Sequence, residues 1–142
     1  MAVPRKMKTM LISAALCLIV PLLNGADDQS GELAKLQGDW VVVLTPEIER
    51  QGVYDAPHAL SIKGDQWIVM NDVGEFKSTI AIDASKSPKT IDQSRNGRKR
   101  RGIYKLEGDT LTICFAVDER PADFTVRTDS KSVVTIYKRR KP

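Results

Sequence analysis

The 142-residue chain contains 22 Lys and Arg, 18 Asp and Glu, two Cys and one His, and 42% of its residues are hydrophobic. This length suits a single domain with a leader. The lone His58 argues against a His-based hydrolase and against a metal cluster, because each of these sites needs several partner groups. We therefore predict a protein that is not an enzyme and that has no cofactor or metal.

The N-terminus has the pattern of a secretory signal peptide. Three basic residues precede an apolar run at residues 10–23, and small residues follow up to Ala26. The run is shorter than the ~20 residues that a membrane-spanning helix needs. We predict that residues 1–26 are a signal peptide, so that the mature protein is secreted or periplasmic and has no membrane span. Retention of the segment as an uncleaved anchor is the alternative.

Cleavage changes both the charge and the cysteine content. The leader holds three of the 22 basic residues and none of the 18 acidic ones, so 22 − 3 = 19 basic residues remain and the net charge is +1. Overall charge therefore gives no argument for a nucleic acid partner. Cys17 leaves with the leader, which excludes an intrachain disulfide in a mature monomer. We interpret the remaining Cys114 as a small buried hydrophobic residue.

Residues 27–35 are predicted to form an N-terminal tether and a short helix. Ser30 suits the N-cap, with the tether before it. Leu33 and Leu36 follow at helical spacing and can face a core.

Residues 36–142 have the pattern of strands and turns throughout. Strands are predicted at residues 40–44, 59–63, 66–70, 75–83, 90–92, 103–106, 110–115, 124–127 and 132–138. Pairs such as Gly64-Asp65 and Asn96-Gly97 are typical turn residues between them. The spacing predicts an all-β domain, either an antiparallel sandwich or an antiparallel up-and-down barrel of about eight strands. Such a barrel is either filled by side chains or wide enough for one small ligand.

The clearest hairpin surrounds the Gly108-Asp109 turn. In its second strand Leu111, Ile113 and Phe115 alternate with polar residues and are predicted to face the core. Cys114 falls on the opposite face.

Short motifs follow one another in a fixed order along residues 36–142. They are LQGDW at 36–40, PKTID at 88–92, GIY at 102–104, GDTL at 108–111, ICF at 113–115, Arg120-Pro121 with Phe124, YKR at 137–139 and KP at 141–142. Their order and spacing resemble those of the small exported lipocalin-like domains of uncharacterised function found in planctomycete-type genomes. Gly38 and Trp40 also resemble the G-x-W motif of lipocalins, whose Trp packs at the closed end of the barrel.

The resemblance implies a lipocalin-like barrel over residues 36–142 and export from the cytoplasm. It brings no catalytic residues. The chain departs from the family pattern in two places, since residues 116–119 lack the usual glycine and the segment before Gly102 is unusually basic.

Aromatic residues on several strands would converge inside a closed sheet. Capture of a small apolar molecule in the barrel is the first functional hypothesis, and a filled structural core is the alternative. The candidate lumen residues are Trp40, Trp67, Phe76, Tyr104 and Phe115.

A basic segment suggests a second hypothesis, a surface that binds anionic envelope polymers. Its candidate residues are Arg98, Lys99, Arg100 and Arg101. If the basic residues 138–141 lie at the same rim, the two groups would form one anion site. The alternative is a solvated loop that discourages pairing between sheet edges. No aromatic residues alternate with these charges, so we expect no nucleic acid partner, and we expect a monomer.

Overall fold

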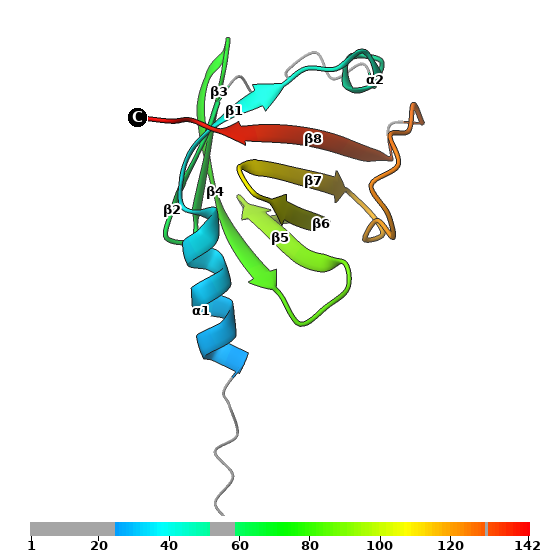
Figure 1. The fold of residues 1–142 in the computed structure, drawn as a ribbon. Coiled ribbons are helices and arrows are strands. Elements are labelled where there is room, and N and C mark those ends of the chain that lie inside the picture. The colour runs from blue at the N-terminus through cyan, green and yellow to red at the C-terminus, as the bar shows by residue number, and fades with distance from the viewer. Residues whose placement is uncertain (1–24, 52–58, 130) are drawn as a thin grey trace, which may run out of the picture.

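The computed structural model describes residues 25–51, 59–129 and 131–142, which form a closed barrel of eight antiparallel strands in up-and-down order (Figure 1). The strands are β1 (Gly38–Val43), β2 (Ala59–Lys63), β3 (Gln66–Asn71), β4 (Gly74–Asp83), β5 (Lys89–Arg95), β6 (Arg98–Glu107), β7 (Thr110–Ala116) and β8 (Ser132–Arg139). Helix α1 (Gly25–Leu36) precedes the barrel, and the short α2 (Pro46–Glu49) follows β1. Pairing of β8 with β1 closes the sheet and confirms the predicted fold class.

Local turn chemistry accounts for the hairpins. Asn96 and Gly97 have φ values of 50° and 75° between β5 and β6. A type I′ turn needs positive φ at both central residues, and the Asn-Gly pair tolerates this. The predicted Gly108-Asp109 turn likewise joins β6 to β7, with Gly108 at φ 61°.

The predicted inward face of β7 is confirmed. Leu111, Ile113 and Phe115 belong to the buried cluster inside the barrel, where inward residues of the other strands meet them. Cys114 faces outward, but it is fully buried against Ile103 and Val134 under Phe124 and Val126, which lie in the connection between β7 and β8. The interpretation of Cys114 as a buried hydrophobic residue therefore holds.

The strand predicted at residues 124–127 is wrong. This segment lies outside every strand ladder, and β7 pairs directly with β8 from Ala116↔Ser132 to Thr110↔Lys138. Phe124 and Val126 alternate because they cover an apolar outer patch of the barrel. Alternation reports burial on one side and does not require a strand partner.

The N-terminal helix is longer than expected. It begins at Gly25, so Ser30 lies inside it rather than at its N-cap, and the predicted tether is helical from residue 27. Gln29 explains the extension, since its amide donates to Asp83 Oδ1 and accepts from the backbone N–H of Ala84, at 3.1 Å in each case. Tertiary contacts thus hold the helical turn that precedes Ser30. Residues 1–24 lie outside the described residues, so the signal peptide stays a prediction.

Substitution of Gly102 tests the close packing of β6 on β7. A Cβ at this position would lie 2.6 Å from the Phe115 ring and 2.7 Å from the carbonyl oxygen of Cys114. We expect Gly102→Ala to lower the free energy of unfolding by about 1–3 kcal/mol, measured by urea denaturation. The control is Gly31→Ala in α1, where a Cβ meets no atom within 4 Å and where Ala favours the helix. Equal effects of the two substitutions would contradict this packing.

Candidate ligand-binding cavity

One end of the barrel is closed by α1 (Figure 1). Trp40 from β1 is buried there, and its indole N–H donates to the carbonyl oxygen of Leu36 at 3.1 Å. The guanidinium carbon of Arg139 lies 4.2 Å from the centre of the Trp40 ring. Arg139 also donates to the carbonyl oxygens of Gln37 at 2.7 Å and Lys35 at 2.8 Å. One arginine therefore joins β8, β1 and the last carbonyls of the helix.

The position of Arg139 corrects the idea of a single basic rim. Lys138 pairs with Thr110 at the closed end, whereas Arg101 pairs with Ala116 towards the other end of the same β7 strand. The up-and-down topology thus separates residues 138–141 from residues 98–101 by the length of the barrel. The two basic groups do not form one anion site.

A buried carboxylate ties α1 to the closed end. Glu32 is 6% exposed, and its Oε1 accepts hydrogen bonds from Lys89 at 2.6 Å and from the hydroxyl of Tyr104 at 3.3 Å. Lys35 donates to Oε2 at 3.1 Å. Burial alone would raise the pKa of Glu32, but the two lysine hydrogen bonds outweigh it and leave the pKa below its ordinary value. Burial also raises the pKa of Tyr104.

A cavity of about 350 Å³ occupies the other half of the barrel. Its apolar walls come from residues of four strands, β1, β3, β7 and β8, among them Val42, Val69 and Phe115. The ring of Trp67 stands edge-on to those of Phe115 and Tyr137, with ring centroids 6.0 and 6.2 Å apart. These three rings form an aromatic wall of the cavity. The sequence alone could not show that they are in contact.

Helix α2 forms part of the cavity wall. Thr45 caps it by accepting a hydrogen bond from the N–H of Ile48 at 3.3 Å, and Pro46 starts its first turn. Gln51, just beyond the helix, donates to the carbonyl oxygen of Val134 at 2.9 Å and accepts from its N–H at 2.8 Å. This amide replaces the strand partner that β8 loses where β1 turns away. The Thr-Pro pair is a helix-start signal that could have revealed α2 in the sequence.

Arg100 brings a positive charge into the cavity. Its guanidinium carbon lies 5.1 Å from the centre of the Phe115 ring, and burial lowers its pKa. Gln93 is its cross-strand partner and donates to Ser78 Oγ at 2.8 Å. A shallower hollow at the rim shares Arg100 with the cavity and adds Arg98, Lys99, and Arg95 stacked over Phe76.

The structure divides the sequence-predicted candidates. Trp67 and Phe115 line the cavity, and Phe76 lies in the hollow at the rim. Trp40 and Tyr104 face inward but belong to the closed end, where Leu36 and Glu32 cover them, and neither lines the cavity. The sequence could not separate them from the residues that line the cavity, because alternation reveals the face of a strand and not the depth in the barrel.

The basic candidates of β6 are also divided between the two hollows. Arg100 lines both hollows, Arg98 and Lys99 border the rim hollow, and Arg101 lines neither. Val42, Tyr137 and α2 also line the cavity, although none of them is a sequence-predicted candidate. His58 lies outside the described residues.

Comparison with protein-family models, with curated proteins and with solved structures finds no match to this chain. The resemblance to exported lipocalin-like domains therefore stays a prediction. In the described part of the chain, His, Cys, Asp and Glu side chains nowhere gather in a group of three or more that could hold a metal ion. Within the same residues no helix has the length and apolar character to cross a membrane.

The Glu32 cluster predicts acid sensitivity of the closed end. Because the pKa of Glu32 is lowered in the folded state, its contribution to stability is fully present above the ordinary value of 4.5 and is lost as the pH falls through the lowered value. We expect Glu32→Gln to reduce the loss of unfolding free energy between pH ~7 and pH ~3, measured by urea denaturation at each pH. Lys89→Gln should also reduce this loss of unfolding free energy at low pH, because it removes one of the hydrogen bonds that lower the pKa of Glu32. An unchanged pH dependence in Glu32→Gln would contradict this role.

Proposed function

We propose that the protein is an exported, non-catalytic binding protein that holds a small, mostly apolar molecule in the cavity at the open end of the barrel. The observation that carries the proposal is the cavity of about 350 Å³ with aromatic and aliphatic walls. Ligand sites are typically concave, largely apolar and about 300–1,000 Å³ in volume, with few polar groups. The N-terminal pattern of residues 1–26 supports the exported location.

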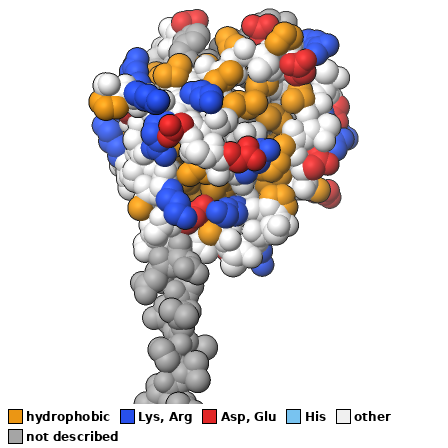
Figure 2. Space-filling model, viewed as in Figure 1, with side chains coloured by type: hydrophobic (Ala, Val, Ile, Leu, Met, Phe, Trp, Pro, Cys, Tyr) orange, Lys and Arg blue, Asp and Glu red, His pale blue; other side chains and the backbone are white. Residues whose placement is uncertain are grey.

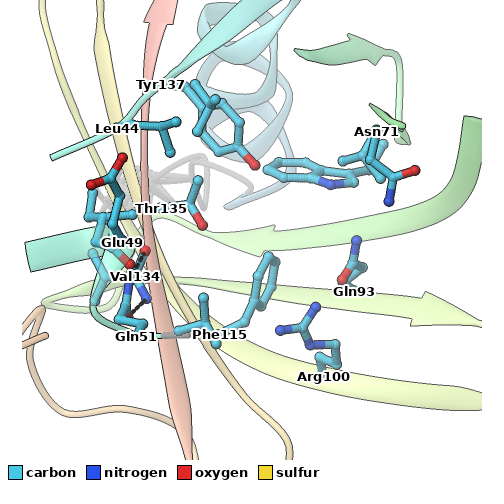
Figure 3. A pocket seen from close by; sticks show the side chains of 15 residues that line it. Leu44, Glu49, Gln51, Asn71, Gln93, Arg100, Phe115, Val134, Thr135 and Tyr137 are labelled. Atoms are coloured by element: carbon cyan, nitrogen blue, oxygen red, sulfur yellow. Dashed lines mark hydrogen bonds between the residues drawn. The ribbon is translucent and has the colours of Figure 1, made fainter. Parts of the chain in front are cut away.

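The polar groups of the cavity form two sets, one on each side of it. Asn71, Gln93 and Arg100 lie together on β3, β5 and β6, while Thr135 and α2 contribute on the β8 side (Figure 3). Such an arrangement fixes the orientation of a ligand whose larger part is apolar. A volume near the lower end of the usual range favours a compact ligand.

Filling the cavity tests the proposal. We expect Val69→Trp, which places a large ring in the cavity, to weaken binding of the neutral probe N-phenyl-1-naphthylamine by about 10-fold or more. The control is Met70→Trp, because Met70 is the next residue of β3, points outward and is 53% exposed. Probe emission measures binding, and circular dichroism verifies that both variants fold. Absence of probe binding to the wild-type protein, or equal binding by Val69→Trp, would refute the proposal.

A basic rim supports a second candidate function, attachment to an anionic envelope polymer. Arg95, Arg98, Lys99 and Arg100 border the rim hollow, and none forms an ion pair with a carboxylate of the described residues. On the face drawn in Figure 2, Lys and Arg are interspersed with Asp and Glu, so attachment would depend on the rim rather than on a broad basic surface.

Charge reversal at the two ends of the barrel tests this second candidate. We expect Arg98→Glu with Lys99→Glu to elute from a dextran sulfate column at lower salt than the wild-type protein. The matched control, Lys138→Glu with Arg140→Glu, makes the same charge change at the opposite end. A similar shift for both double variants would show that only net charge matters.

A further inference from the structure

The cavity contains a charged group that the protein itself leaves without a counter-ion. Arg100 projects from β6 and lies over Phe115 at the cavity wall (Figure 3). It is absent from the ion pairs formed among the described residues. Glu49, the carboxylate that also lines the cavity, comes from α2 on the far side in Figure 3. The charge of Arg100 is therefore met by a ring face rather than by an acid.

Arg100 is an exposed residue at the open end of the barrel, so water reaches its guanidinium when the cavity is empty. Arginine stays protonated in proteins and carries five N–H donors. An anion that enters the cavity would therefore meet a cation that no carboxylate of the described residues already pairs with. The planar guanidinium fork also matches a carboxylate in a bidentate geometry.

Asn71 provides a second donor near the same place. Its Oδ1 accepts the N–H groups of Val73 at 3.0 Å and Gly74 at 3.1 Å within the β3–β4 turn. The turn thus fixes the side chain by its oxygen and leaves the NH₂ end of the amide for another partner. Asn71 and Arg100 line both the cavity and the rim hollow. An anion at this position would meet donors from two strands.

We infer that the ligand is a compact amphipathic anion, whose apolar body packs on Trp67, Phe115 and Tyr137 and whose carboxylate binds Arg100 with help from Asn71. This inference rests on the proposed function and adds the chemical class of the ligand. The apolar body would pack on the aromatic wall, and the anionic head would pair with Arg100, the one Lys or Arg side chain of the described residues that lines the cavity.

Three eight-carbon compounds test the inference because they differ only in the head group. Octanoate, 1-octanol and octylamine compete with N-phenyl-1-naphthylamine for the purified protein. We expect octanoate to bind at least about 10-fold more tightly than 1-octanol, because only its carboxylate can pair with the guanidinium of Arg100. Octylamine should be the weakest competitor.

Two arginines on the same strand give the matched variants. Arg100→Gln should weaken octanoate binding by about 10-fold or more, so that octanoate no longer competes better than 1-octanol. Arg101→Gln loses the same charge from the next residue, which lines neither hollow, and should keep the preference. Arg100→Lys should retain part of it, which separates loss of charge from loss of folding.

The outcomes distinguish this inference from the proposed function. Equal binding of octanoate and 1-octanol to the wild-type protein would overturn the anionic head group and leave an apolar ligand in place. An equal loss of the octanoate preference in Arg100→Gln and Arg101→Gln would also overturn it, because the overall positive charge of this region would then explain the preference. Failure of the probe and all three compounds to bind would refute the proposed function itself.

Discussion

The contact between Trp40 and Arg139 is the interaction on which the architecture depends. These two residues are register partners across the β1–β8 ladder, the only non-consecutive strand pairing of the barrel, and the guanidinium stacks on the indole. Arg139 also donates hydrogen bonds to the carbonyl oxygens of Lys35, in the last turn of α1, and of Gln37, just beyond it. The same side chain therefore connects the β1–β8 ladder to the helix that covers this end of the barrel. Without the β1–β8 ladder in which this contact lies, the sheet would be a meander with two open edges.

The cavity follows from how far that closing ladder extends. β1 and β8 pair from Trp40↔Arg139 to Val43↔Ile136, and β8 continues beyond this point to Ser132. Beyond that point the side-chain amide of Gln51, next to α2, forms hydrogen bonds with both the N–H and the carbonyl oxygen of Val134. Because a helix and a single amide replace a strand here, the wall is looser than at the closed end. Space remains between the aromatic rings and α2.

The hairpins and the strand faces could be predicted because they depend on neighbouring residues. Asn96-Gly97 and Gly108-Asp109 specify turns locally, and alternation identifies inward residues such as Leu111. Depth along the barrel could not be predicted in this way, since it depends on strand tilt and on which element covers each end. Trp67 and Tyr104 both point inward, yet one lines a cavity and the other bonds to Glu32 under a helix.

Two arginines of similar appearance in the sequence have opposite situations in the structure. The guanidinium of Arg139 donates hydrogen bonds to the carbonyl oxygens of Lys35 and Gln37, and its Nε donates to Asp109 Oδ1 at 3.3 Å. Arg100 has an aromatic face beside it but no acid among the described residues. A cation that the fold has fully paired stabilises the fold, whereas one held at a cavity without an anion leaves binding free energy for a ligand to gain. At the closed end the arginine is paired and at the open end it is not, and this contrast supports the proposal that Arg100 recognises the ligand.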